Sequence, residues 1–376
     1  MPSVEHAILI GDHLQLRAQI SNNALQMENP AGRKYGLDES VFERLADGKF
    51  DGAEFPIATL NVQRRMHPSI ASLVGDTLYP HLQNHESTEA YPDVVGMRRR
   101  LFWLDHRHRE DSGAQDTSKS NKWEADMVVS LVKHLALQGA YYGREDIAVL
   151  TPYLGQLRIL RSKFAADFNL VVGEKDMEEI EVQERREMLA GKEAEVHEGN
   201  QLRRGKLSDA IRIATVDNFQ GEEAKIIVIS LVRSNESHKC GFLKTDNRIN
   251  VLLSRAQHGM YIIGDSETAR EGSMWVRVIG MLEKGGNIGP KLALRCPRHP
   301  DTDILVQKNE DFRRLAPEGG CTVTCGNPLK CGAYSRSMRL LTHVLRPIVL
   351  TAFSQAILAR WHAMLLPSTR RMSPFQ

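Results

Sequence analysis

Residues 211–232 read IRIATVDNFQGEEAKIIVISLV, two apolar runs joined by a short polar turn. The second run, Ile226–Val232, is apolar without alternation, as expected of a strand that is covered on both faces. Gln220 in the turn can bond a phosphate or an attacking water, and Gly221 lets the backbone approach such a group closely. The stretch therefore predicts two buried strands with a polar loop between them.

The same rhythm extends to either side, because apolar runs alternate with helix-like segments over most of the chain. Such alternation predicts a doubly wound α/β sheet. A short run at the start, Ala7–Ile10, also reads as a strand, and we interpret it as the last piece of a domain whose remainder is absent. The other predicted strands are Ile57–Val62, Leu101–Leu104, Ile147–Leu150, Ile211–Thr215, Ile226–Val232 and Met260–Ile263, and the helices are Ser69–Tyr79, Lys122–Gln138 and Leu154–Phe168.

Composition restricts the class of protein. With 49 Lys and Arg against 47 Asp and Glu, the net charge of the 376 residues is +2, so any nucleic-acid binding depends on local patches. No run of about 20 apolar residues indicates a membrane span, and the first residues do not form a signal peptide. Cysteine is too rare for a disulfide scaffold. In a reducing compartment, the clustering of Cys296, Cys321, Cys325 and Cys331 favours metal binding.

Several polar stretches follow predicted strands, where an open parallel sheet forms its ligand crevice. Their key residues are Gln15, Arg65, Gln220 and Arg255. Arg65 offers a planar donor fork that suits phosphate oxygens. Arg255 lies on an apolar helical pattern, so it needs either an internal carboxylate or a ligand phosphate as a partner. The stretches are Gly11–Leu16, Gln63–Pro68, Thr215–Glu223 and Asn250–Ala256.

In this order, the stretches resemble the later motifs of superfamily-one helicases of the nonsense-mediated-decay type, over roughly residues 1–270. Thr151–Gln156 resembles the nucleic-acid-contacting T-P-Y-x-x-Q turn of that family, and Arg248–Ala256 resembles its motif six. The sequence of Val216–Lys225 and the Cys-rich region that follows the motifs look closest to helicases that carry NF-X-type zinc fingers. Those helicases are linked to RNA interference and heterochromatin. The resemblance implies a RecA-like P-loop NTPase fold, a parallel sheet with helices on both faces.

The resemblance also implies an activity: ATP and Mg²⁺ bind between two motor domains and drive movement on single-stranded RNA or DNA. Localisation in nucleus or cytoplasm and partners in RNA silencing, with no membrane, are implied with it. Arg255 would be an arginine finger, which typically contributes about 10³–10⁵ in rate. The implied catalytic residues are Gln15, Arg65, Gln220 and Arg255, the cofactor-binding residues Gly221 and Glu222, and the nucleic-acid-binding residues Thr151, Pro152, Tyr153 and Gln156.

Two elements of such an enzyme are missing from the sequence. It contains no G-x-x-x-x-G-K-[ST] phosphate loop and no Asp-Glu pair for Mg²⁺ upstream of Gly11. The family carries both in its first motor domain. We therefore expect the C-terminal half of a helicase, from a fragment or a truncated gene sequence, without useful ATP hydrolysis of its own. The alternative is a non-catalytic module that binds nucleic acid or protein.

The cysteine cluster resembles the start of an NF-X-type zinc finger, Cys321-x3-Cys325-x5-Cys331-Gly332. The next expected ligands are replaced by Ala333 and Ser335, so three thiolates are one short of a closed zinc site. A preceding C-P-x-H stretch can supply the shortfall, and an unmetallated remnant is the alternative. The predicted zinc ligands are Cys296, His299, Cys321, Cys325 and Cys331.

These observations predict four regions. Residues 1–53 are a remnant of the first RecA-like domain, and 54–270 form the second. Its charged insertion, 174–206, is a solvated helix, a mobile insertion or a nucleic-acid-contacting arm. Residues 271–333 are a linker and a truncated zinc finger, a small irregular Cys-containing region. The basic tail 334–376 contains no Asp or Glu, and either disorder or a reading-frame error explains it.

Overall fold

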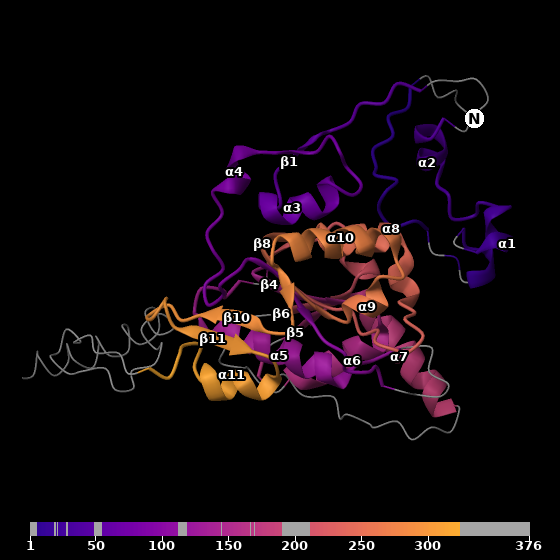
Figure 1. Ribbon diagram of the computed structural model, residues 1–376. Coiled ribbons are helices and arrows are strands. Elements are labelled where there is room, and N and C mark those ends of the chain that lie inside the picture. The colour runs from indigo at the N-terminus through magenta and orange to yellow at the C-terminus, as the bar shows by residue number, and fades with distance from the viewer. Residues whose placement is uncertain are drawn as a thin grey trace, which may run out of the picture.

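The computed structural model describes residues 6–18, 20, 22–27, 29–48, 55–111, 119–143, 145–165, 167–168, 170–189 and 211–323. Its centre is a seven-stranded sheet with the strand order β5-β6-β4-β7-β8-β3-β9, in which every pair is parallel. Helices cover both faces of this sheet (Figure 1). The predicted α/β fold class is therefore confirmed.

The strands match the predicted apolar runs closely where those runs are long. In β7, Ile226 and Val228 face one core cluster while Ile227 and Ile229 face the other, which explains a run without alternation. The three-residue strand β5 and the two-residue strand β9 escaped prediction, because so few residues carry no readable pattern. The strands of the sheet are β3 Leu101–Asp105, β4 Ile147–Thr151, β5 Leu170–Val172, β6 Ile211–Thr215, β7 Ala224–Ser230, β8 Ala256–Gly264 and β9 Ile288–Gly289.

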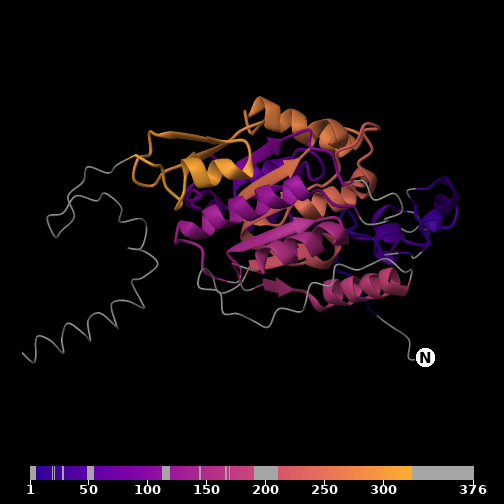
Figure 2. The ribbon, with the colours of Figure 1, turned by 90° about the horizontal axis from the view of Figure 1, so that it is seen from below.

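The two faces of the sheet carry different helices (Figures 1 and 2). One face packs against α5 Lys122–Leu137, α6 Leu154–Phe164 and α11 Asn309–Leu315. The other packs against α3 Pro68–Gly75, α8 Asp246–Leu253 and α10 Ser273–Lys284. Shorter helices are α4 Glu86–Glu89 and α9 Ser266–Ala269. No helix among the described residues is long and apolar enough to cross a membrane.

The N-terminal segment lies outside the sheet and includes η1 Asn23–Leu25, α1 Pro30–Arg33 and α2 Val41–Ala46. The predicted strand Ala7–Ile10 is wrong, because no described residue pairs with it, and Ile10 is 94% exposed. Similarly, Ile57–Val62 is extended, but only Val62–Gln63 (β1) pairs, with β2 Gln83–Asn84. A strand needs a neighbour, which an apolar run cannot supply by itself.

The sheet continues past the predicted domain limit at residue 270, because α10 covers it and β9 is its edge strand. An antiparallel hairpin follows, formed by β10 Leu292–Arg295 and β11 Asp303–Val306, and α11 comes after it. Residues of this hairpin lie in the same core cluster as α5. Residues 292–321 are therefore packed against the central domain, not set apart as a linker.

The charged insertion begins as a helix, α7 Glu174–Leu189. Its Asp176 and Ile180 are fully buried, so the first turns are not solvated on all sides. Residues 190–206 and the predicted basic tail 334–376 lie outside the described residues.

Candidate functional site

The first predicted stretch, Gly11–Leu16, docks on α8, the helix that carries most of the last predicted stretch, Asn250–Ala256. Asn247 of α8 donates from Nδ2 to the carbonyl oxygens of His13 (3.1 Å) and Gln15 (2.5 Å). Asn250 donates to the carbonyl oxygen of Leu14 at 2.8 Å. Stretches that are more than 230 residues apart in sequence therefore form one site.

Asp12 is held in this loop by side chains from two directions. Its carboxylate accepts hydrogen bonds from the Tyr79 hydroxyl (2.7 Å) and from Gln15 Nε2 (3.1 Å). Asn250 Nδ2 lies 2.6 Å from the Tyr79 oxygen. Burial and the Asp12 carboxylate raise the pKa of Tyr79 well above its ordinary value, so Tyr79 is a neutral donor at physiological pH. Sequence reasoning missed Tyr79, which follows α3.

Arg255 is the most deeply buried of the predicted site residues that carry a charge, at 1% exposed. Its Nη2 donates to Gln15 Oε1 at 3.0 Å, its Nε to the Val251 carbonyl at 3.0 Å, and its Nη1 to the Glu222 carbonyl at 3.4 Å. These acceptors are neutral, and within the described part of the chain no carboxylate pairs with Arg255. Burial, followed by the nearby charge of Arg65, lowers the pKa of Arg255 to about 10. The guanidinium therefore stays charged at neutral pH and is suited to an anion.

Arg65 lies near Arg255 but has its own carboxylate. It forms an ion pair with Glu223, and its Nη1 donates to the Ser254 carbonyl at 3.0 Å. Gln257 Nε2 donates to the same carboxylate at 2.7 Å. Burial acts to raise the pKa of Glu223, but these partners outweigh it and lower the pKa. Glu223 was also missed, although it directly follows Glu222 in the predicted motif.

Next to these residues lies a cavity of about 800 Å³. Glu222 on its wall is tied to Arg212 by two hydrogen bonds, of 3.0 Å and 2.8 Å. Gly221 has φ +87°, a left-handed conformation that favours glycine. Sequence reasoning gave no role to Arg212, which stands within a predicted strand. The wall includes the predicted Gln15, Gln220, Gly221 and Glu222 together with Gly11, Asp12, Gly173, Glu174, Lys175 and Arg212.

The predicted nucleic-acid turn follows β4. Gln156 is fully buried: its Oε1 accepts from the Asn121 backbone N–H (2.8 Å), and its Nε2 donates to the Asn121 carbonyl (3.1 Å) and Ser230 Oγ (3.0 Å). Thr151 is also fully buried, and Tyr153, 3% exposed, donates to the Cys240 carbonyl. Of the four predicted contact residues only Pro152 is partly exposed, as are Leu154 and Gly155 between them. Contact of this turn with nucleic acid stays a prediction, and in this arrangement Gln156 instead connects α5 to β7.

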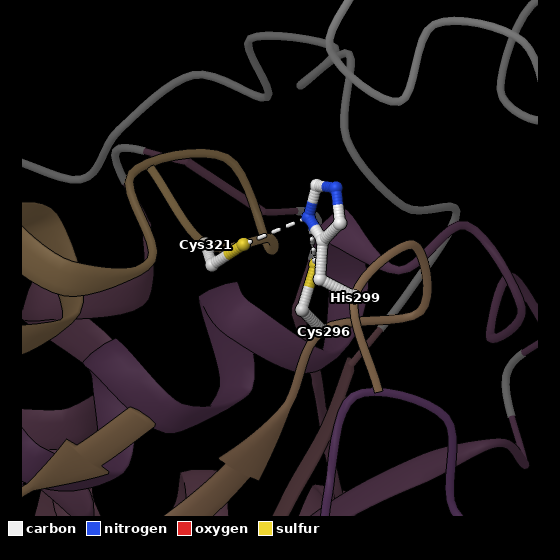
Figure 3. A group of neighbouring side chains, drawn as sticks. All are labelled: Cys296, His299 and Cys321. Carbon is white, nitrogen blue, oxygen red and sulfur yellow. Dashed lines mark hydrogen bonds between the residues drawn. The ribbon is translucent and has the colours of Figure 1, made fainter. Parts of the chain in front are cut away.

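Three of the predicted metal ligands come together at the hairpin (Figure 3). Cys296 follows β10, His299 lies in the turn before β11, and Cys321 follows α11. His299 Nδ1 is 3.0 Å from Cys321 Sγ and 3.9 Å from Cys296 Sγ, and all three atoms lie within 4.8 Å of one another. Tetrahedral zinc separates S and N ligands by roughly 3.5–3.8 Å, so side-chain shifts of about half an ångström would bring these three atoms to that spacing, with the fourth position left open. Cys325 and Cys331 lie outside the described residues.

The two thiols at this site are shifted in opposite directions. Burial acts to raise the pKa of Cys296, but backbone N–H groups of Cys321 and His299 outweigh it and lower the pKa. Burial raises the pKa of Cys321, and the neighbouring Cys296 adds to the increase. The lowered pKa of Cys296 favours its thiolate, which is the form of cysteine that binds a metal.

Comparison with known proteins identifies the class of this chain. A family model described as "AAA domain" matches residues 37–267, more than half of the chain, so the chain belongs to that family. Its relatives place it with helicases of the superfamily-one type, as the motifs predicted.

Three curated relatives illustrate the likeness. The chain is 36% identical over 328 residues to the Homo sapiens "NFX1-type zinc finger-containing protein 1", covering 87% of this chain and 14% of that protein. It is 33% identical over 283 residues to "Helicase required for RNAi-mediated heterochromatin assembly 1" of Schizosaccharomyces pombe, covering 75% and 23%. It is 29% identical over 279 residues to an Arabidopsis thaliana "Regulator of nonsense transcripts 1 homolog", covering 72% and 18%. The chain thus spans less than a quarter of each relative's length.

Proposed function

We propose that this chain is the C-terminal motor half of an ATP-dependent RNA or DNA helicase and completes the ATP site of such a motor. The observation that carries the proposal is the buried guanidinium of Arg255. It has only neutral acceptors and lies against Gln15, which lines the 800 Å³ cavity. A buried cation without a carboxylate is costly unless an anion joins it, and a phosphate is such an anion.

In this proposal Arg255 stabilises the charge that develops on the phosphoryl group during transfer. Gln15 holds the guanidinium until the phosphate arrives, and Arg65 is a second cation that Glu223 keeps in position. Gly221 and Glu222 lie on the cavity wall, where the ribose or the water shell of Mg²⁺ is expected. Gln220 orients phosphate or water from the same wall. The phosphate loop and the metal ligands have to come from outside this chain.

The finer parts of the proposal rest on the family likeness. We propose that single-stranded RNA, or alternatively DNA, passes the turn Thr151–Gln156. We also propose a role in RNA-mediated silencing, which the name of the Schizosaccharomyces pombe relative supports. Silencing proteins as partners and a location in nucleus or cytoplasm belong to the same proposal.

The test compares ATP hydrolysis by this chain with that of a longer chain extended upstream through a phosphate loop, each with and without single-stranded RNA. Activity in the longer chain alone supports the helicase half. Inactivity of both chains with RNA binding retained would favour a non-catalytic binding module. Activity of the short chain would contradict the need for a phosphate loop.

Arg255→Ala in the longer chain supplies the residue-level test. We expect hydrolysis to fall by about 10³–10⁵ while RNA affinity changes little, because the guanidinium acts on the phosphoryl group. Arg270→Ala, which removes a surface pair with Glu283, is the matched control and should keep full activity. Unchanged hydrolysis in Arg255→Ala would remove the proposed role.

A further inference from the structure

The metal-ligand hairpin shares the core of the central domain. Leu294 and Cys296 belong to the same buried cluster as Leu131 and Leu135 of α5. Phe312 of α11 packs against His134 of α5, with 5.8 Å between the ring centroids. A zinc finger that is joined only by a linker has no such shared core. The segments that carry the metal ligands therefore pack directly against α5.

The contact is most specific at the C-terminal end of α5. Gln138 Nε2 donates to the Gly319 carbonyl at 2.9 Å and to the His134 carbonyl at 2.8 Å. Gly319 has φ +76°, and a Cβ placed there would lie 2.6 Å from Gln138 Nε2. Cys321 follows Gly319 after one residue. The backbone that presents Cys321 is thus fitted closely against the end of α5.

The N-terminal end of α5 is bound to the end of β7. Glu124, fully buried, accepts hydrogen bonds from the Val232 backbone N–H (2.9 Å) and Ser230 Oγ (2.6 Å). Asn121 donates from Nδ2 to the Val232 carbonyl at 3.3 Å. Val232 has φ +72°, a strained conformation for a β-branched residue that persists only when its surroundings hold it. A single helix therefore links the metal ligands to a strained turn of the central sheet.

We propose that Cys296, His299 and Cys321 bind zinc as an integral part of the motor domain, and that this metal stabilises the whole sheet through Gly319, Gln138 and α5. The hairpin and the segment after α11 supply these three ligands. Within the described residues, the three come together in the absence of a separate zinc-finger domain. Because the folded state presents the three ligands in place, bound zinc stabilises that state against the unfolded chain. The proposal goes beyond the nucleotide site and does not depend on it.

The first experiment strips the full chain of metal with a chelator and titrates it with Zn²⁺ or with Co²⁺, whose absorption reports thiolate ligands. Thermal unfolding is followed by tryptophan fluorescence in a chain with Trp123→Phe and Trp361→Phe, which leaves Trp103 and Trp275, both buried in the central domain on the far face from the hairpin. We expect one tightly bound zinc and a rise in Tm of about 5–10 °C.

The matched variants are Cys296→Ser, which removes a ligand, and Cys240→Ser, which removes a buried free cysteine elsewhere. Only Cys296→Ser should lose the metal and the rise in Tm. The proposal is overturned if the chain binds no zinc, or if zinc binds without moving the tryptophan transition. It is also overturned if Cys325→Ser or Cys331→Ser abolishes binding while Cys296→Ser does not.

The second experiment tests the link through α5. Gly319→Ala and Gln138→Ala should each weaken zinc binding, about tenfold or more for Gly319→Ala, because the alanine places backbone strain and a Cβ clash next to Cys321. Gly48→Ala is the control, since Gly48 also has positive φ (+67°) but a Cβ there meets nothing within 4 Å. If Gly319→Ala does not fold, Gln138→Ala gives the same readout. Zinc affinity equal to wild type in Gln138→Ala would overturn the link.

Discussion

At the scale of single residues, His134 makes the fold sensitive to pH. It is buried on α5, where its Nε2 donates to the Gly96 carbonyl at 3.0 Å and its Nδ1 has no partner. Burial lowers the pKa of His134 to about 4, against a smaller opposing effect of the Gly96 hydrogen bond. In the unfolded chain the pKa is about 6.5. Between these values the unfolded chain takes up a proton that the native state does not.

The contribution of His134 to the free energy of unfolding should therefore be fully present above about pH 6.5. It should be lost as the pH drops toward 4, which lowers the free energy of unfolding by about 3 kcal/mol. His134→Gln should lack that part of the loss. Urea unfolding at pH 7.5 and pH 5.0, in chelator so that metal binding does not contribute, measures the difference between the two proteins. Equal losses in wild type and His134→Gln would contradict the prediction.

The sequence located the predicted site residues better than their partners. Gln15 and Arg255 stand in recognisable motifs, and the fold brings them within 3.0 Å of each other. The partner of Arg65 is Glu223, 158 residues away, and Tyr79 and Arg212 stand in ordinary apolar or strand patterns. Ion-pair partners of this kind depend on which strand ends become neighbours. No local pattern contains that information.

At the scale of elements, α7 is a helix, as one of the predicted alternatives had it, but its first turns are not solvated on all sides. Its Asp176 is fully buried and accepts hydrogen bonds from Thr215 Oγ1 (2.6 Å) and Asn218 Nδ2 (2.7 Å), so it supports the turn that leads to Gln220. Because the segment contains so many charged residues, its sequence did not distinguish the buried carboxylate of Asp176 from the exposed ones. Long strands were predictable for the opposite reason, because a run such as that of β7 is apolar on both faces.

Asp176→Ala should lower the free energy of unfolding by about 1–3 kcal/mol, because it leaves buried donors unsatisfied. Glu178→Ala on the exposed side of the same helix should stay within about 0.5 kcal/mol of wild type. Urea unfolding of both variants measures this contrast. A cost for Asp176→Ala no larger than that for Glu178→Ala would show that α7 does not support the turn.

At the scale of the whole molecule, two extended segments carry unusually exposed apolar side chains. Ile8 and Ile10 are 89% and 94% exposed, and Ile57 and Leu60 are 60% and 95% exposed. Apolar extended backbone of this kind invites pairing with another chain. We expect the chain to self-associate as its concentration rises.

Ile10→Lys combined with Leu60→Lys should reduce that association without lowering Tm, because neither side chain is packed. Val276→Lys, at an exposed apolar position of α10, is the control and should associate like wild type. Static light scattering over a concentration series measures the outcome. A wild-type chain that is monomeric throughout would contradict the expectation.

The docking of Gly11–Leu16 on α8 also has a consequence for folding during synthesis on the ribosome. Asn250 and its acceptor Leu14 are 236 residues apart, and Gln15 and Arg255 are 240 apart. At about 5–20 residues per second, synthesis of the intervening chain takes roughly 10–50 s. For that time the nascent segment has no α8 to bind, and Ile8 and Ile10 are available to chaperones. The segment Gly11–Leu16 is thus synthesised long before the helix on which it docks.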